Sequence, residues 1–441
     1  MFNRFKKITL FLGDLVGLHL ALFLTLLLRY PQNLLAKYWQ NHWPVFWPVF
    51  IIWLLILYIS NLYDLNLRAK SRVFLGTTAN AAIISIFLSI LYFYLGTNTN
   101  ITPKTNLVIF SAIFVIIFLV WRLLSQIAIH SLFLKENLAI IGANQLTDQL
   151  VLEIKNNPGA GYQVTWVCSD AQALAALPDN IKSKNIRTVV ITDNFGSSAK
   201  LSAALFTCLT YNINFFNYPD FYESLVGKVP LEAIDSDWFL NNLREGQKNY
   251  FNSLKQLLDW LLAGVILVLS LPLWPLIALI IKLTSRGPVF FRQDREGEKE
   301  KIFKIIKFRT MRVDGNDLTP TAEDDQRIFG FGSFLRQTRL DEIPQVLNIL
   351  RGEMSFIGPR PERPEMVAEL EKQIPFYKTR LLIKPGLTGW DQISGAYHSP
   401  SVADTYEKLQ YDLFYLKHRS FYLDLTIILK TLATMVSRGG R

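Results

Sequence analysis

Two adjacent carboxylates, Asp341 and Glu342, lie in the stretch RQTRLDEIPQVLNILRGEMSFIGPRP, residues 336–361. Apolar residues follow them at helical spacing, and Pro344 is compatible only with the first turn of a helix. An acid that caps a helix stabilises it by about 1 kcal/mol. Considered alone, the dipeptide therefore favours a structural cap over a reaction centre.

Basic residues around the two acids change this interpretation. The chain carries more nearby cations than two acids need as ion-pair partners: Lys307, Arg309, Arg336, Arg339, Arg360 and Arg363. Guanidinium groups bind phosphate oxygens through paired hydrogen bonds, so the set suits a polyphosphate substrate. Neighbouring residues of a helix point about 100° apart, so the two acids would have different roles. One carboxylate could attack phosphorus while the other holds a hard cation such as Mg²⁺.

The composition limits which elements can position such a site. The chain has 441 residues, 50% of them hydrophobic, and a formal net charge of +10. This length allows two or three domains, and the charge favours an anionic partner such as a membrane surface or a phosphorylated substrate. Long apolar blocks favour the membrane, and no zinc-finger or base-stacking pattern indicates nucleic acid. Two cysteines, Cys168 and Cys208, are too few for a disulfide framework or a zinc site of their own.

The first third of the chain contains four apolar blocks. They lie at about 8–29, 44–63, 75–96 and 106–130. Each reaches the roughly 20 residues that a helix needs to cross a membrane, so we expect a four-helix transmembrane bundle at 1–135. Basic residues concentrate before the first block, after the second and at the end of the fourth: Arg4, Lys6, Lys7, Arg68, Lys70, Arg72, Arg122 and Lys135. The positive-inside rule therefore predicts that both ends of the bundle lie in the cytoplasm.

Residues 136–247 have the pattern of an α/β domain. The segments NLAIIGAN and RTVVITD predict buried parallel strands, and we expect helices at Gln145–Lys155 and Ala199–Thr210. The stretch IIGANQLTDQLV resembles the strand–turn–helix start of a Rossmann unit, but Asn144 and Thr147 replace the later glycines of the dinucleotide fingerprint. We therefore expect a Rossmann-like domain without a catalytic dinucleotide, acting in regulation or in assembly such as a homodimer.

A fifth apolar block runs from Leu257 to Leu283 and has basic residues on both sides. A crossing helix would place one basic cluster on the wrong side of the membrane. Pro272 and Pro275 also lack amide donors and interrupt the helix. We therefore expect a re-entrant helix at 248–284, broken at Pro272, that enters and leaves by the cytoplasmic face. The alternative is a kinked fifth span, which would put the C-terminal domain outside.

Other polar residues have simpler explanations. Asp14 lies within the first apolar block, where we expect a polar contact to a neighbouring helix, although an intramembrane acid is also a functional candidate. His398 and His418 stand alone and are more simply packed or solvated. The acidic run at 322–327 is most simply a solvated loop, and Ser420–Val436 is typical of an amphipathic helix at the membrane interface.

Three longer motifs carry a resemblance to a known family. They are GPVFFRQDREGEKEKIFKIIKFRTM, LRQTRLDEIPQVLNILRGEMSFIGPRPERPE and KPGLTGWDQISG. Together, over about 250–441, they resemble the bacterial sugar transferases, that is, the polyprenyl-phosphate glycosyl-1-phosphate transferases or monotopic phosphoglycosyl transferases. The four spans and the degenerate Rossmann-like domain resemble the long form of this family, which initiates exopolysaccharide, O-antigen or capsule synthesis.

The resemblance implies a fold and an activity. It implies a multi-pass protein of the bacterial inner membrane with a mainly helical, cytoplasmic catalytic domain at 285–441. The enzyme would transfer a sugar-1-phosphate, such as a hexose-1-phosphate, from a UDP-sugar to undecaprenyl phosphate and release UMP. Asp341 would be the nucleophile that carries the phosphosugar, and Glu342 would bind Mg²⁺. Phosphate-binding roles would fall to matching polar positions: Lys307, Arg309, Arg336, Arg360 and Asp424.

One position departs from the family pattern, and two other functions remain open. The family's re-entrant helix often breaks at Ser-Pro, whereas Leu271 precedes Pro272 here and Ser270 comes one residue earlier. The first alternative function is a membrane glycosyltransferase that moves the sugar alone and releases UDP. The second is a non-catalytic membrane scaffold, against which the intact acid pair and its basic neighbours argue.

Overall fold

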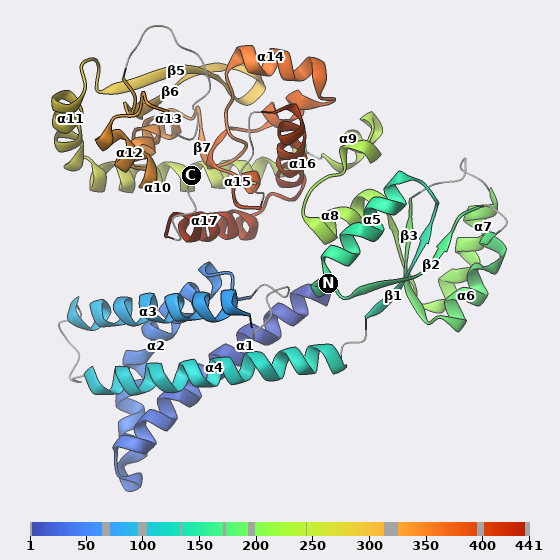
Figure 1. The fold of residues 1–441 in the computed structure, drawn as a ribbon, viewed down its shortest axis with the longest axis horizontal. Helices are drawn as coiled ribbons and strands as arrows, with labels where there is room; N and C mark the ends of the chain where they lie inside the picture. Colours follow the sequence, from blue (N-terminus) through green and yellow to red (C-terminus); the bar gives the residue numbers. More distant parts are fainter. Residues whose placement is uncertain are drawn as a thin grey trace. The chain divides into compact units, whose positions relative to one another are not determined.

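The computed structural model describes most of the chain. The described ranges are 2–63, 71–95, 104–132, 135–170, 173–192, 199–243, 245–312, 325–394 and 401–436. The chain is mostly helical and divides into two compact units, Met1–Phe221 and Tyr222–Arg441, whose elements are labelled in Figure 1.

The first unit begins with four long helices. They are α1 (Phe2–Arg29), α2 (Leu35–Ile59), α3 (Arg72–Leu95) and α4 (Lys104–Leu132). Each contains one of the predicted apolar blocks almost completely, so the apolar helices near the N-terminus are confirmed. Within the described residues, these four and α10 (Asn249–Ser270) are long and apolar enough to cross a membrane. Of the cations used for the orientation, Arg68 and Lys70 lie outside the described residues.

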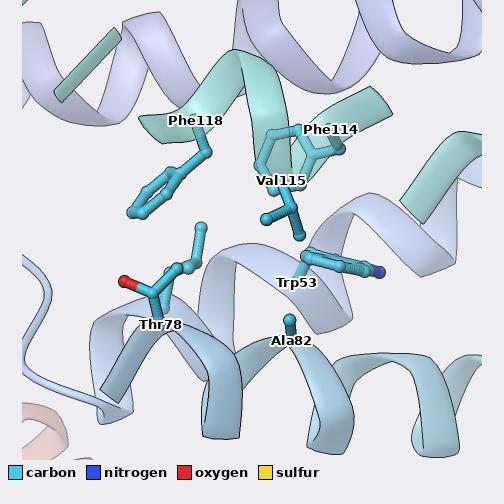
Figure 2. A pocket seen from close by; sticks show the side chains of 7 residues that line it. Trp53, Thr78, Ala82, Phe114, Val115 and Phe118 are labelled. Carbon is cyan, nitrogen blue, oxygen red and sulfur yellow. The ribbon is translucent and has the colours of Figure 1, made fainter. Parts of the chain in front are cut away.

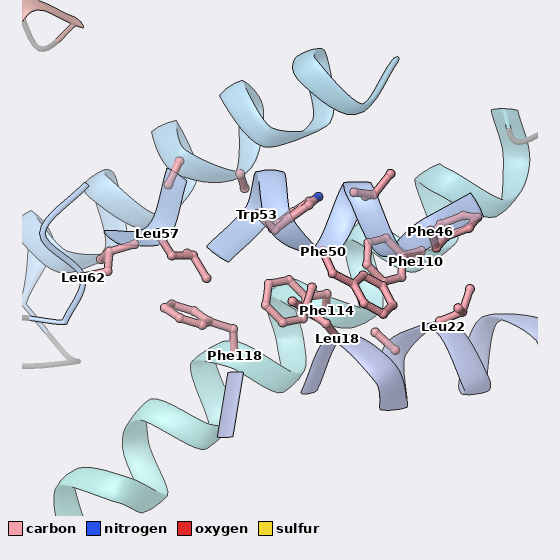
Figure 3. Packing of buried hydrophobic residues seen from close by; sticks show 14 of the residues in the cluster. Leu18, Leu22, Phe46, Phe50, Trp53, Leu57, Leu62, Phe110, Phe114 and Phe118 are labelled. Atoms are coloured by element: carbon pink, nitrogen blue, oxygen red, sulfur yellow. The ribbon is translucent and has the colours of Figure 1, made fainter. Parts of the chain in front are cut away.

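Aromatic rings form much of the core of this helical bundle. Figure 3 shows phenylalanines of α2 and α4 meeting Trp53, whose ring centroid lies 5.0 Å from that of Phe114 at 86°. On α1, Gly13 permits a close approach to α4, because a Cβ atom there would lie 2.2 Å from the Trp121 side chain. Small residues allow such contacts between apolar helices. The bundle is therefore packed through interlocking side chains of distant segments.

The cavity in Figure 2 lies inside this bundle between α2, α3 and α4. Its volume is about 10 Å³, which is room for one water molecule at most. Thr78 is the polar side chain of its lining, and the Thr78 hydroxyl donates to the carbonyl of Phe74 at 2.8 Å. The cavity is therefore a packing defect and does not hold a substrate.

Asp14 makes the polar contact that the sequence predicts. Its carboxylate is 2.7 Å from the guanidinium of Arg122 on α4, and both side chains are buried. The Arg122 guanidinium also lies 4.8 Å from the ring centroid of Tyr63 and 4.7 Å from that of Phe118. An ion pair inside an apolar bundle stabilises one pairing of the two helices, because either partner alone would be a buried, uncompensated charge.

The α/β part of the first unit contains a four-stranded parallel sheet. Its strands are β1 (Glu136–Ile141), β2 (Tyr162–Cys168), β3 (Ile186–Ile191) and β4 (Asn214–Asn217), in the order β2-β1-β3-β4. Helix α5 (Gln145–Asn156) lies on one face, and α6 (Leu177–Ser183) and α7 (Ala199–Cys208) lie on the other (Figure 1). The predicted strands and helices are therefore confirmed here.

The residues that replace the fingerprint glycines close the first turn of α5. The Asn144 side chain accepts from the backbone N–H of Thr147 at 3.1 Å, and its amide donates to the carbonyl of Thr192 at 3.1 Å. The Thr147 hydroxyl donates to the carbonyl of Gly142 at 2.9 Å. Side chains thus fill the space through which a pyrophosphate approaches an intact fingerprint.

The second unit is built around helices with two small sheets. The boundary between the units lies in α8 (Tyr218–Val226). The further elements are α9 (Ser236–Asn242), α10, α11 (Leu273–Thr284), β5 (Phe290–Glu296), β6 (Ile302–Phe308), α12 (Gly330–Gln337), α13 (Val346–Leu350), β7 (Ser355–Ile357), α14 (Pro364–Gln373), β8 (Gly386–Thr388), α15 (Trp390–Ser394), α16 (Val402–His418) and α17 (Phe421–Val436). Strands β5 and β6 are antiparallel, and β7 and β8 are parallel. Val229, Leu231 and Trp238 pack in a core with α14 and α16, so contacts of this unit begin well before residue 247.

The fifth apolar block is two helices rather than one. Helix α10 ends at Ser270, Pro272 precedes the first residue of α11, and Figure 1 shows α11 turned away from the axis of α10. The Ser270 hydroxyl donates to the carbonyl of Leu267 at 3.3 Å and accepts from the indole of Trp274 at 3.2 Å. Pro275 lies in the first turn of α11, where a proline is tolerated. The helical run is therefore interrupted only at Pro272.

Candidate active site

Asp341 and Glu342 lie on a short 3₁₀ helix, η8 (Leu340–Gln345), between α12 and α13. The residue that precedes η8 is Arg339, which has the left-handed φ of 54° and makes no side-chain capping bond. Both acids are therefore inside the helix and not at its cap. The interpretation of the pair as a helix cap is wrong, because the helical segment is capped by Arg339, two residues before Asp341.

Asn348 fixes the acid-bearing segment against β6. Its side-chain oxygen accepts from the backbone N–H of Ile306 at 3.1 Å, and its amide donates to the carbonyl of Lys304 at 2.8 Å. The side chain thus continues the hydrogen bonding of the free edge of β6. Asn348 is completely buried, and Lys307 follows directly on the same strand. The sequence analysis missed this residue, and an isolated asparagine among apolar residues was its only signal.

Glu342 is held in its charged form by two cations. Its Oε1 atom lies 2.7 Å from Lys307 Nζ and 3.9 Å from Arg360 Nη2. Burial alone would raise the pKa of this carboxyl, but the charges of Lys307 and Arg360 and the Lys307 hydrogen bond outweigh it and lower the pKa to about 2. Glu342 is therefore ionised throughout the physiological range.

Asp341 has the opposite environment. The residue is 8% exposed, and burial together with the neighbouring charge of Glu342 raises the pKa of its carboxyl to about 6. Lys307 and Arg336 oppose this shift and keep it moderate. Two adjacent acids whose pKa values are pushed apart are typical of different chemical roles. Asp341 at neutral pH is a desolvated carboxylate beside cations, which suits a nucleophile.

Arg360 reaches the pair from the loop after β7. Its side chain is 47% exposed, so the guanidinium that faces Glu342 also has donors open to a ligand. Lys307 from β6, Arg336 from the end of α12 and Arg360 therefore surround the acids from three separate elements. These three residues of the predicted cationic set lie around the acid pair, and the charge of a fourth, Arg339, also lowers the pKa of Glu342.

Two predicted site residues have other partners. Arg309 is buried, and its guanidinium donates to the carbonyls of Ser285 at 2.7 Å and Arg286 at 2.9 Å. It thereby ties the end of β6 to the chain that leaves α11. Asp424 pairs with Lys255 at 2.8 Å, and its other oxygen accepts from the hydroxyl of Tyr415 at 2.8 Å.

Within the described residues, neither Arg309 nor Asp424 forms a hydrogen bond or an ion pair with the acid pair. Asp424 instead connects α17 to α10, which carries Lys255. These two side chains position elements around the site, and no ligand-binding geometry is visible for them. The Nε2 atom of His418 lies 2.8 Å from the carboxylate of Glu223. His398 and residues 322–324 lie outside the described residues.

The donors available to a metal are the two carboxylates of the pair. In the described part of the chain, no group of three or more His, Cys, Asp or Glu side chains could hold a metal ion. Mg²⁺ commonly uses one or two carboxylates and completes its shell with substrate phosphates and water. Asp341 and Glu342 fit that pattern, so a phosphorylated ligand would have to supply the remaining oxygens.

These features define a class of protein: a membrane-associated chain with a pair of unlike carboxylates in a cationic site for phosphorylated ligands. The particular family follows from comparison with known proteins. The bacterial sugar transferase family model matches residues 250–438. The chain is 31% identical over 310 residues to the UDP-glucose:undecaprenyl-phosphate glucose-1-phosphate transferase of Escherichia coli K12, covering 67% of each protein. The chain belongs to the bacterial sugar transferase family.

Other relatives show which activities occur in this family. The chain is 34% identical over 318 residues to a protein of the same name from Xanthomonas campestris, covering 67% of this chain and 66% of the relative. It is 34% identical over 235 residues to the UDP-N-acetylgalactosamine-undecaprenyl-phosphate N-acetylgalactosaminephosphotransferase of Aeromonas hydrophila, covering 53% and 55%. The chain thus spans somewhat more than half to two thirds of the length of these relatives.

Proposed function

We propose that this protein transfers a sugar-1-phosphate from a UDP-sugar to undecaprenyl phosphate, giving undecaprenyl-diphosphate-sugar and UMP. The observation that carries the proposal is Asp341, a buried carboxylate with its pKa raised to about 6 by burial and by Glu342, surrounded by cations. The named relatives use UDP-glucose or UDP-N-acetylgalactosamine with undecaprenyl phosphate, so a UDP-hexose is the natural donor to test. This reaction would be the first membrane step of a surface polysaccharide.

In the first half-reaction, a carboxylate oxygen of Asp341 attacks the phosphorus that carries the sugar. The new bond is the acyl-phosphate O–P bond, and the bond that breaks joins this phosphorus to the oxygen of UMP, which leaves with the electron pair. Lys307, Arg336 and Arg360 face the charge that develops on the phosphate oxygens. Glu342 stays ionised and keeps Lys307 and Arg360 oriented.

In the second half-reaction, an oxygen of undecaprenyl phosphate attacks the same phosphorus. The diphosphate O–P bond forms, the bond to Asp341 breaks, and the carboxylate is regenerated. Burial of Asp341 limits access of water, which would otherwise hydrolyse the acyl phosphate.

Mg²⁺ held by Glu342 would neutralise diphosphate charge and stabilise the departing UMP. The ionised state of Glu342 supports this proposal, since its pKa is lowered to about 2 by Lys307 and Arg360. Lys307 neutralises Glu342 in this arrangement, at a distance of 2.7 Å.

The membrane arrangement belongs to the same proposal. We propose that α10 and α11 form a re-entrant hairpin and that the second unit lies in the cytoplasm of the bacterial inner membrane. Support comes from the inner face of α10, where Ala263, Ile266 and Leu267 pack against the core that contains β6 and α13. A helix bound in this way along a folded core is poorly placed to cross a bilayer. Its other face exposes apolar side chains that suit lipid: Leu257, Leu258, Leu261, Leu262, Val265, Val268 and Leu269.

The test is nucleotide release by purified full-length protein with Mg²⁺, undecaprenyl phosphate and either UDP-glucose, UDP-galactose or UDP-N-acetylgalactosamine. We expect UMP from the wild type and no turnover from Asp341→Asn. Normal turnover is expected from the control Lys378→Gln, because Lys378 pairs with Glu300 and Glu371 and not with the acid pair. A phosphosugar trapped on the wild-type protein would identify the intermediate. Release of UDP would overturn the proposal in favour of transfer of the sugar alone, and normal turnover by Asp341→Asn would exclude the nucleophilic role.

A further inference from the structure

The loop that presents Arg360 is held in an unusual way. Its residues 359–362 follow β7, and each of their four carbonyl groups accepts a hydrogen bond from a part of the chain remote in sequence. The donors are Gly386 N to Pro359 O at 2.9 Å, Arg380 Nη2 to Arg360 O at 3.0 Å, Arg295 Nη1 to Pro361 O at 2.9 Å and Glu296 N to Glu362 O at 3.0 Å. Four consecutive peptide groups are thus fixed from β8, from the segment before it and from β5.

The proline content of the loop explains why remote donors are needed. Pro359 and Pro361 have no amide hydrogen, so two residues of the loop supply no local donor for its carbonyl groups. Backbone carbonyls near a protein core need partners, and here two of the four partners are guanidinium groups. The prolines also restrict φ, so the backbone at Arg360 is limited both by its neighbours and by its hydrogen bonds.

All of the hydrogen bonds that Arg380 forms in the described part of the chain fix its guanidinium beside the loop that carries Arg360. Arg380 is 5% exposed, its Nε atom donates to Asp412 Oδ2 on α16 at 2.9 Å, and its Nη2 atom lies 2.8 Å from the same oxygen. Its Nη1 atom donates to the hydroxyl of Tyr377 at 2.8 Å. Asp412 compensates the buried charge, and the fork geometry leaves Nη2 directed at the carbonyl of Arg360.

Arg295, on strand β5, donates to the next carbonyl of the loop, that of Pro361. Besides Pro361 O, it donates to Gln293 Oε1 at 2.8 Å, and its Nη1 atom lies 3.6 Å from the carboxylate of Glu362. Its side chain is 21% exposed, so it is less deeply buried than Arg380. Within the described residues, neither guanidinium forms a hydrogen bond or an ion pair with Asp341 or Glu342.

We propose that Arg380 and Arg295 are positioning residues that act through Arg360. They hold the carbonyls of Arg360 and Pro361, which are two consecutive peptide groups directly after the Arg360 Cα. This directs the Arg360 guanidinium at Glu342, 3.9 Å away, and at the phosphate that the site binds. The inference rests on the proposed function, because the role of Arg360 is the contact with transferring phosphate. A shift of about 1 Å in a group that orients a reaction costs up to about 100-fold in rate.

A double-mutant cycle tests this inference in the full-length enzyme. Arg380→Lys and Arg295→Lys keep the positive charge but lose the planar guanidinium that bonds two acceptors at once. In the wild-type background, each is expected to lower kcat about tenfold or more with little change in KM. In an Arg360→Ala background the same substitutions are expected to change kcat by less than about twofold, because the group they aim is absent. Equal losses in both backgrounds would mean general destabilisation and would overturn the proposal.

Hydrogen exchange supplies a readout that needs no substrate. The amides of Gly386 and Glu296 donate to the same loop, so Arg380→Lys and Arg295→Lys are expected to speed their exchange. Lys378→Gln is the matched control, since Lys378 lies beside Arg380 in sequence but pairs with the carboxylates of Glu300 and Glu371. Unchanged exchange in both arginine variants would overturn the proposal. If Arg380→Lys fails to fold, the test is done with Arg295→Lys alone, because Arg295 is less buried than Arg380.

The two proposals fail in different ways. If the wild type releases no UMP from any UDP-sugar, the proposed reaction is wrong, and exchange alone then decides whether the arginines hold the loop. If the wild type is active and the cycle is additive, the reaction stands and the positioning role is wrong.

Discussion

Two carboxylates that are neighbours in sequence differ at the residue scale because their neighbours in space differ. Glu342 touches Lys307 and faces Arg360, whereas Asp341 is buried and bears the unfavourable charge of Glu342. A group poised to attack phosphorus must be ionised but weakly solvated, and burial beside a partly compensated acid produces that state. One arrangement of cations thus sets which carboxyl has its pKa lowered and which one would react in the proposed mechanism.

The first prediction concerns the pH dependence of activity. The Asp341 carboxyl has its pKa raised to about 6 by burial and by Glu342, and only its ionised form can attack. We expect kcat/KM to rise with pH through about 6 and then to level, until other groups titrate. A pH–rate profile for the wild type checks this, with Glu342→Gln as comparison. Removing the Glu342 charge should move the acidic limb to lower pH, and an unmoved limb would assign it to another group.

The second prediction concerns stability at the same residue. Because folding raises the pKa of Asp341, the unfolded chain ionises first, and this carboxyl destabilises the fold as pH rises between about 4 and 6. Asp341→Asn is therefore expected to be inactive and yet more stable at neutral pH, by about 1–3 kcal/mol. Thermal or denaturant unfolding at pH 7 and pH 4 measures it. The gain should shrink at pH 4, and a variant less stable than wild type at pH 7 would contradict the assignment.

At the scale of elements, short segments are brought together by backbone contacts that leave no space for side chains. A Cβ atom on Gly386 of β8 would lie 2.1 Å from the backbone nitrogen of Gly358, and one on Gly358 would lie 2.3 Å from the carbonyl oxygen of Lys384. The loop with Arg360 begins at this contact. Asn348 plays the corresponding role for the acid pair by binding the edge of β6.

The third prediction tests the glycine contact. Gly386→Ala is expected to force β7 and β8 apart, which would lower stability by about 1–3 kcal/mol and lower turnover at least tenfold. Gly330→Ala is a matched control at the start of α12, where a Cβ atom would have no neighbour within 4 Å. Unfolding and UMP release measured for both variants decide the matter. Equal behaviour of the two would show that the close approach does not matter.

At the scale of the whole molecule, the proposed reaction would transfer a sugar-phosphate from a soluble nucleotide sugar to a membrane lipid. One face of α10 packs on the core of the second unit, and the other face and α11 expose leucines and valines. The helix that supports the site is therefore also the surface available to lipid. Ser270 bonds to a carbonyl and to Trp274 at the break, so the turn at Pro272 is a defined feature and not a disordered one.

The fourth prediction concerns the sidedness of this hairpin. Cysteines placed at Tyr250 and Arg286, which are exposed on either side of the two helices, are expected to react with a membrane-impermeant maleimide only from the cytoplasmic side. Cys168 and Cys208 are buried and should contribute little background in the folded protein. Labelling of the two positions from opposite sides would establish a fifth span and contradict the re-entrant arrangement.

The sequence by itself determined the apolar helices and the parallel α/β strands, because each depends on local periodicity. It also singled out Asp341 and Glu342 by their adjacent residue types, and their chemical roles stay predictions. It could not decide the partners of long side chains. Arg309 and Asp424 have the residue types of a phosphate site, yet their charges meet backbone carbonyls and Lys255. Arg380, Arg295 and Asn348 act on segments at least 20 residues away, so no local pattern marks them. Hydrophobic periodicity can be seen in the order of neighbouring residues. The role of a buried polar group depends instead on which distant segment folding brings within hydrogen-bonding distance.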